Sequence, residues 1–224
     1  MVPLLFQETL FHPLPDGALF WPAEEALLVA DLHFEKAQFF AQVGQYLPPY
    51  DSQETLRSLA DAIEATGAQR LFCLGDSFHH ADGITHMPDE TRHMLKGLAA
   101  RLEDWIWITG NHDEATPFSF GRTLPELILR GIALRHEAMA NSHQPEISGH
   151  FHPKLRLRTR GQSIARRCFL TNGNKLILPA FGALTGGLDA GHPAIHAVMP
   201  GPVTALVPSG ERLLRFPVAA KVAA

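Results

Sequence analysis

The residues most able to do chemistry in this sequence are aspartates, one asparagine and histidines that follow short apolar segments. They are Asp31, His33, Asp76, His79, Asn111, His112, Asp113, His136, His150 and His152. Carboxylate oxygen, amide oxygen and neutral imidazole together suit divalent cations such as manganese, iron and zinc. The many imidazoles argue against a pure magnesium site, because Mg²⁺ prefers oxygen ligands. We therefore expect a site for two divalent cations.

Short apolar segments must position these residues. Ala26–Ala30, Arg70–Leu74 and Trp105–Thr109 are typical of buried strands, and each ends just before polar residues of this set. Asp51–Thr66 and Pro88–Leu102 have the apolar spacing of helices, and Asp51 is expected to cap the first of them. Alternating strands and helices predict a parallel sheet, which binds ligands at the carboxyl ends of its strands. The polar residues should therefore meet at one edge.

Spacing within the polar segments supports this arrangement. Asp31 and His33 are two residues apart, as are His150 and His152, so on an extended strand both members of each pair face the same side. Glycine, which lacks a Cβ and permits close backbone approach, precedes three of the groups. These glycines are Gly75, Gly110 and Gly149.

The second half of the chain has a different character. We expect a short helix over Leu124–Arg130 and a short strand over Ile132–Arg135, after which β-type segments dominate. These further strands are expected at Lys154–Arg160, Arg167–Thr171, Lys175–Leu178, Ala194–Met199, Val203–Val207 and Arg212–Phe216. They favour a mostly antiparallel sheet. We expect one domain over residues 1–224, with a frayed tail at 217–224.

Charge is unevenly distributed along the chain. The net charge of −4 argues against a uniformly basic nucleic-acid-binding protein, but Ile147–Leu188 holds seven of the 19 basic residues and no acidic residue. Alternation would place four basic side chains on one face of a strand, with Leu155 and Leu157 facing inward. The four are Lys154, Arg156, Arg158 and Arg160. This face suits an anionic partner, and a solvated surface strand is the alternative.

Other features limit the class of protein. Hydrophobic residues make up 46% of the chain and charged residues 19%, which is typical of a globular protein. No apolar run is long enough to span a membrane, and the first residues do not resemble a secretory signal. Cys73 and Cys168 lie in apolar segments and match no zinc spacing, so we expect reduced core residues. A cytoplasmic location without membrane contact follows.

Taken together, the segments DLH, GDSFH, GNHD and GHFH resemble the motifs of the calcineurin-like metallophosphoesterase superfamily. The resemblance implies a four-layer α/β/β/α sandwich with a dinuclear metal site. One cation would bind Asp31, His33, Asp76 and His152. The other would bind Asp76, Asn111, His136 and His150, so that Asp76 bridges the two.

The separate histidine of this pattern has two candidates. His136 ends an apolar strand and is followed by Glu137, as in a turn of the superfamily, whereas His143 lies in a polar loop. We prefer His136 as the metal ligand.

The expected reaction is hydrolysis of a phosphodiester by a hydroxide that two cations activate. His112 is expected to contact the phosphate or to protonate the leaving oxygen, while Asp113 holds its other ring nitrogen. His79 is either a second catalytic residue or a rim residue.

A narrower resemblance covers most of the chain. ADLHFEKAQFFAQVGQYLP, GHFHPKLRLR, RRCFL and LPAFGALTGGLD resemble segments of bacterial ligase-associated DNA damage response endonucleases. This resemblance implies a manganese-dependent single-strand DNA endonuclease linked to a repair ligase and a helicase, with iron or zinc as other metals. Glu35 departs from the family pattern and adds a charge near the metals.

Two other functions remain open at this stage. The metal motifs fit a small-molecule phosphodiesterase or phosphatase equally well, whereas a non-catalytic scaffold would usually have lost some of them. Phe34, Phe39 and Phe40 could stack on bases, but core packing is the simpler interpretation.

Overall fold

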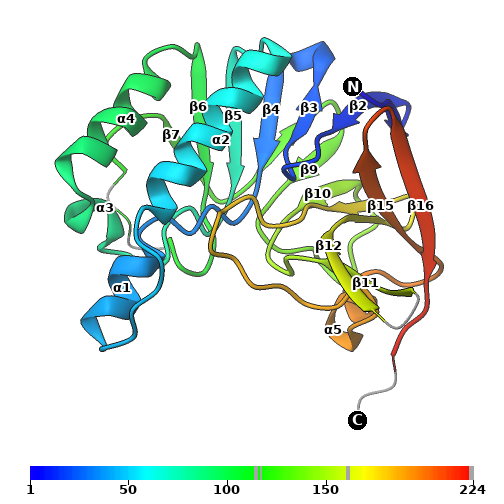
Figure 1. Ribbon diagram of the computed structural model, residues 1–224. Coiled ribbons are helices and arrows are strands. Elements are labelled where there is room, and N and C mark those ends of the chain that lie inside the picture. Colours follow the sequence, from blue (N-terminus) through cyan, green and yellow to red (C-terminus); the bar gives the residue numbers. More distant parts are fainter. Residues whose placement is uncertain (114–115, 117, 160–161, 222–224) are drawn as a thin grey trace.

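The computed structural model describes residues 1–113, 116, 118–159 and 162–221, with only the backbone of Arg158 and Thr159. Two large sheets face each other, and helices cover their outer sides (Figure 1). The lower ends of β4, β5 and β6 lie near the middle of this view, beside the second sheet (Figure 1).

The first sheet has seven strands in chain order. They are β1 (Leu4–Phe6), β2 (Thr9–Pro13), β3 (Leu19–Trp21), β4 (Ala26–Val29), β5 (Arg70–Leu74), β6 (Asp104–Ile108) and β7 (Arg122–Leu124). The first four are antiparallel neighbours, and β4 to β7 run parallel. Because β4, β5 and β6 are parallel and in register, their carboxyl ends lie side by side. The three strands expected here from the sequence are confirmed.

The second sheet also has seven strands. In spatial order they are β16 (Arg212–Val218), β15 (Val203–Ser209), β13 (Phe169–Thr171), β14 (Lys175–Ile177), β10 (Glu146–Ser148), β9 (Ile132–Leu134) and β8 (Leu127–Leu129). Most neighbours are antiparallel, as expected, but β10 runs parallel to both β14 and β9. This parallel core brings the carboxyl ends of β9 and β10 to the same edge as those of β4, β5 and β6.

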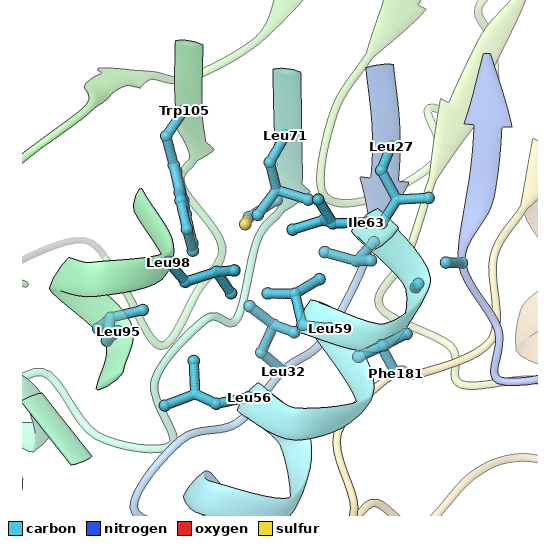
Figure 2. Close-up of a cluster of buried hydrophobic side chains, with 14 of the residues drawn as sticks. Leu27, Leu32, Leu56, Leu59, Ile63, Leu71, Leu95, Leu98, Trp105 and Phe181 are labelled. Carbon is cyan, nitrogen blue, oxygen red and sulfur yellow. The ribbon is translucent and has the colours of Figure 1, made fainter. Parts of the chain in front are cut away.

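The helices complete the outer layers. They are α1 (Lys36–Gln42), α2 (Asp51–Thr66), α3 (Gly83–His86), α4 (Asp89–Ala99) and α5 (Pro193–Val198), with a 3₁₀ turn at Pro22–Glu24. Leu56 and Leu59 of α2 pack with Leu95 and Leu98 of α4 against the outer face of the first sheet (Figure 2). On the other side, Ile195 of α5 packs on the second sheet.

A separate apolar cluster fills the space between the sheets. It joins Leu28, Leu74 and Ile106 of the first sheet to Ile147 and Leu176 of the second. With helices on both outer faces, the molecule is a four-layer α/β/β/α sandwich, as the family resemblance implies. The cysteines also behave as expected, since Cys73 and Cys168 are buried and unpaired.

Two secondary-structure predictions are wrong. Leu124–Arg130 is not a helix: Leu124 pairs with Ile108 in the first sheet and Leu127 with Leu134 in the second, because Pro125 lets the chain cross between sheets. Residues 194–199 were expected as a strand, yet α5 covers Pro193–Val198. Pro193 is favoured at a helix start, and the His192 side chain accepts the N–H of Ala194.

Asp51 also differs from its prediction. Tyr50, in the left-handed region with φ of 72°, occupies the cap position of α2, and Asp51 is the first helical residue. The Asp51 carboxylate instead accepts the N–H of Ala37 at 3.1 Å, which ties the start of α2 to α1.

The basic segment forms a two-stranded ribbon outside both sheets. β11 (Lys154–Thr159) pairs antiparallel with β12 (Gln162–Arg167), and within the described residues this pair forms a sheet of its own. Leu155 is buried as expected, but Leu157 is 37% exposed, because the ribbon has no sheet beneath its outer end. The expected inward position of Leu157 is therefore wrong.

The tail is partly ordered by contacts. Strand β16 continues to Val218, and the backbone N–H of Lys221 donates to the carbonyl oxygen of Gly191 at 2.8 Å. Residues 222–224 lie outside the described part. Among the residues that the structure describes, no helix combines the length and apolar character needed to span a lipid bilayer.

A buried ionic network supports the centre of the second sheet. Glu146 on β10 is fully buried and contacts Lys175 of β14, and its Oε2 lies 3.2 Å from Nη1 of Arg135. Its Oε1 also accepts the N–H of Met139 at 3.1 Å. The network thereby fixes the chain on both sides of the loop 136–145.

We expect Glu146→Gln to lower the free energy of unfolding by about 3–5 kcal/mol, because it leaves the buried Lys175 without its anion and leaves Arg135 with Glu126 alone. Urea unfolding of the metal-free protein measures this. The control Glu54→Gln breaks an exposed Glu54–Arg57 pair and should cost less than about 1 kcal/mol. Equal stability losses in the two variants would contradict this view of the network.

Candidate metal centre

Three of the predicted ligands form one compact group. Asp31 and His33 follow β4 of the first sheet, and His152 follows β10 of the second. The Nε2 atoms of His33 and His152 are 3.4 Å apart, and Nε2 of His152 is 3.3 Å from Oδ1 of Asp31. Ligand atoms that share a cation at about 2.1 Å lie about 3.0–3.4 Å from one another. The group therefore has the spacing of a metal site.

The other predicted ligands gather around Nε2 of His136. This nitrogen is 2.8 Å from Oδ1 of Asn111, 3.0 Å from Nδ1 of His150 and 3.5 Å from Oδ2 of Asp76. Asp76 and Asn111 follow β5 and β6 of the first sheet, whereas His136 and His150 follow β9 and β10 of the second. Both groups are thus divided between the two sheets.

The two groups adjoin each other. Nδ1 of His136 is 3.8 Å from Oδ1 of Asp31, and the backbone N–H of His150 donates to Oδ2 of Asp31 at 2.9 Å. Asp76 lies with His136 and His150, and its expected bridging of two cations remains a prediction.

The protonation of the imidazoles suits metal binding. Burial, to which the neighbouring His152 and Lys36 add, lowers the pKa of His33 to about 2, so this ring is neutral. Nδ1 of His136 lies 3.1 Å from the carbonyl oxygen of Leu74 and donates to it, which leaves Nε2 with a free lone pair. Lone pairs and carboxylates that face each other at these distances need a cation between them, so the donor set fits two divalent metals.

The backbone of this site is unusual. Asp31, His33, Asp76, His150 and His152 all have φ between 47° and 72°, in the left-handed region that residues other than glycine rarely adopt. Such conformations cost of the order of 1–3 kcal/mol each and persist where surrounding contacts enforce them. They turn the side chains back over the edges of the sheets instead of letting the strands continue.

All three predicted glycines permit the close packing of the loops, and a Cβ on Gly75 would lie 2.3 Å from Nδ1 of His136. A Cβ on Gly110 would lie 2.3 Å from Oδ1 of Asp76, and a Cβ on Gly149 would lie 2.7 Å from Oδ2 of Asp31. Each glycine thus admits a ligand side chain from a different segment, and the inference that glycine precedes the ligands for steric reasons is confirmed at all three positions.

Asp113 does not hold His112, contrary to the sequence prediction. Its buried carboxylate accepts the N–H groups of Ser77 at 2.9 Å, Phe78 at 3.1 Å and Gly110 at 3.3 Å. Satisfying three backbone donors is a stronger demand than orienting one exposed ring. Asp113 therefore joins the loops after β5 and β6.

His112 is oriented by stacking instead. Its ring lies nearly parallel to that of His79, with centroids 5.5 Å apart, and His79 stacks in turn on Phe40 of α1. Burial, with the positive charge of Lys36 adding to it, lowers the pKa of His79 to about 4. The His112 side chain remains 41% exposed, with Nε2 3.9 Å from Oδ2 of Asp76, so it can approach a ligand of the site.

The sequence alone predicts no contact between Phe40 and the histidines. The adjacent Phe39 and Phe40 favour core packing as the simpler interpretation. That interpretation holds for Phe34, which is fully buried, but Phe39 and Phe40 are half-buried against the rings of His79 and His80.

The predicted basic residues lie beside the site on the ribbon. Nζ of Lys154 donates to the carbonyl oxygen of Thr185 at 3.2 Å, and the exposed Arg156 lies with Nε 3.7 Å from Oδ2 of Asp189. The side chain of Arg158 and all of Arg160 lie outside the described residues.

His143, the other candidate for the separate histidine ligand, lies away from the metal groups. His143 is exposed in the loop before β10, whereas His136 is buried among the candidate ligands.

Glu35 is buried beside Ser52, and burial raises its pKa to about 7. The extra carboxyl therefore faces α2 at the side of the site.

Comparison with known proteins agrees with this architecture. A family model described as calcineurin-like phosphoesterase matches residues 26–169. The nuclease MPE of Pseudomonas putida has a similar fold, with a TM-score of 0.71 at 24% identity over 96% of this chain and 98% of that chain. The phosphoesterase Yfce of E. coli gives a TM-score of 0.43 at 16% identity over 88% and 99%. No curated protein matches the sequence.

We expect His136→Ala to lower the manganese content from two ions per chain toward one, because it removes the nitrogen around which Asn111, His150 and Asp76 gather. His143→Ala is the matched control and should retain both ions. Elemental analysis of protein loaded with Mn²⁺ and then dialysed measures the content. Equal manganese in the two variants would exclude His136 as a ligand.

Proposed function

The chain belongs to the calcineurin-like phosphoesterase family and is therefore a phosphoester hydrolase; from this premise we propose that it is a manganese-dependent endonuclease that cuts single-stranded DNA. The observation that carries the proposal is the pair of adjoining groups, Asp31, His33 and His152 beside Asp76, His136 and His150. Asn111 completes the second group. A pair of cations bound there would polarise a phosphodiester and lower the pKa of bound water.

Support for a nucleic-acid substrate comes from outside the metal groups. The nuclease from Pseudomonas putida shares the fold over nearly its whole length. Lys154 and the exposed Arg156 extend from the site along the ribbon, and a row of cations suits a phosphate backbone. Arg158 and Arg160 continue the same sequence pattern. The motifs shared with ligase-associated endonucleases support single-stranded DNA as the substrate and a place in cytoplasmic DNA repair beside a ligase and a helicase.

The chain's own residues would share the remaining work. His112, exposed and stacked on His79, is placed to hold the phosphate or to give a proton to the leaving oxygen. His79 and Phe40 would fix the plane of its ring. Asp113 would keep the loops that carry Asp76 and Asn111 at a constant separation.

The test compares two substrates with the same preparation. With Mn²⁺, the protein should cut circular single-stranded DNA and also hydrolyse bis-p-nitrophenyl phosphate, and a chelator should abolish both activities. Hydrolysis of the small diester without any cutting of DNA would indicate a small-molecule phosphodiesterase instead. Undiminished activity after complete chelation would contradict the metal-dependent reaction.

We expect His112→Ala to lower the turnover number on single-stranded DNA by about 10²–10⁴-fold, because a positioned acid or hydrogen-bond donor contributes that much. The manganese content should stay at the wild-type level, since His112 lies outside both metal groups. Single-turnover cleavage and elemental analysis of the same sample measure the two quantities. A variant that cuts DNA at the wild-type rate would show that His112 has no catalytic role.

A further inference from the structure

A glycine-rich loop, residues 182–187, lies directly against both segments that supply the first metal group. The N–H of Gly182 donates to the carbonyl oxygen of Asp31 at 3.2 Å, and a Cβ on Gly182 would lie 2.2 Å from the carbonyl oxygen of Leu32. At the other end, a Cβ on Gly187 would lie 2.2 Å from the carbonyl oxygen of His152. The loop therefore cannot move far from the metal group without breaking these contacts.

Further hydrogen bonds hold the loop from its outer side. The guanidinium of Arg167 donates to the carbonyl oxygens of Phe181 at 3.1 Å and Gly182 at 2.7 Å. The N–H of Ala183 donates to Oγ1 of Thr55 of α2 at 3.0 Å, and Lys154 donates to the carbonyl of Thr185. The loop is thus fixed mainly through its carbonyl groups.

Backbone N–H groups in the middle of the loop are available to a ligand. In the part of the chain that the structure describes, Leu184, Gly186 and Gly187 donate no backbone hydrogen bond, whereas the N–H of Thr185 closes a turn over Ala183 and Leu184. A Cβ on the exposed Gly186 would meet nothing within 4 Å, so a ligand can approach the backbone there. Backbone N–H groups that follow one another in a turn form concave sites that bind anions.

Two lysines follow the ligands of the first metal group, and one of them, Lys154, contacts the loop at Thr185. Lys36 begins α1, three residues after His33, and Lys154 follows His152 by two residues. Neither ammonium group lies within 4.0 Å of a carboxylate oxygen of the described residues, although Asp51 attracts Lys36 at longer range. Burial lowers the pKa of Lys154, and the positive charges of Arg167, Arg156 and Lys36 add to this effect, so the cations share one region. Asp189, at the end of the loop, is engaged by Lys221 at 2.8 Å.

We propose that the N–H groups of Leu184, Gly186 and Gly187, together with Lys154 and Lys36, bind a second phosphate of the substrate strand, next to the phosphate that is hydrolysed. The proposal rests on the proposed nuclease function and specifies how the enzyme recognises a polynucleotide. A phosphate has several acceptor oxygens, and it satisfies backbone donors and two ammonium groups at once. The enzyme would therefore prefer a cleavable bond that has a charged neighbour.

The substrate itself offers the sharpest test. Thymidine decamers are made with uncharged methylphosphonate at every linkage except one cleavable phosphodiester, or except two adjacent phosphodiesters, with the second on either side of the first. We expect one of the two-phosphate decamers to be cut with kcat/KM about tenfold higher per cleavable bond than the single-phosphate decamer, as charge-assisted hydrogen bonds imply.

Protein variants then locate the effect. Lys36→Met and Lys154→Met should each reduce the tenfold preference to less than about threefold, because a preference made by the lost contact disappears with it. Lys96→Met carries the same substitution on an exposed lysine of α4 and should keep the full preference. Thermal unfolding checks that all three variants are folded.

The outcomes separate this proposal from the one on which it rests. If the second phosphate gives no preference on either side, or if the preference survives in both lysine variants, the subsite is wrong while the nuclease function stands. If the decamers remain uncut although natural single-stranded DNA is cut, a single neighbouring phosphate is not what the loop recognises, and the subsite is again wrong. If no DNA is cut at all, both proposals fail together.

Discussion

The buried carboxylates of Asp31 and Asp76 lie at the contact between two sheets, and candidate ligand atoms from the opposite sheet face them at 3.3–3.5 Å. Desolvated charges and lone pairs at such distances repel one another unless cations lie between them. Each metal group takes side chains from both sheets, so neither group exists unless the sheets pack in one register. The apolar cluster around Leu28, Ile106 and Ile147 maintains that register.

Local structure at the edge of the sheets also brings the candidate ligands together. Left-handed backbone at five of the candidate ligands turns the chain away from the strand direction, and Gly110 and Gly149 let carboxylates of other segments come close. Asp113 then fastens the loops after β5 and β6 through three backbone N–H groups. These features cost stability individually, and the two large sheets compensate for that cost. The result is a compact cluster of candidate ligands.

Much of this could be predicted from the sequence, for identifiable reasons. Ala26–Ala30, Arg70–Leu74 and Trp105–Thr109 are continuous apolar runs that end in polar motifs, so both the strands and the convergence of the ligands were readable. The helix at Pro193–Val198 could not be predicted, because a short apolar run is compatible with either a strand or a helix, and only the capping contact of His192 distinguishes them. Leu157 is exposed because the ribbon does not pack on a sheet at that point. The role of Asp113 depends on backbone N–H groups of a loop that is distant in sequence. No local pattern carries such information.

The central claim is that two cations bind side by side, and electron paramagnetic resonance of the Mn²⁺-loaded protein tests it most directly. Ions about 3.5–4 Å apart, as in other two-metal sites, share a ligand or solvent molecule, so their spins should couple. With two equivalents of Mn²⁺, the account predicts a multiline spectrum from a coupled pair and the loss of the six-line signal of isolated ions. An undiminished six-line signal from fully bound manganese would contradict it.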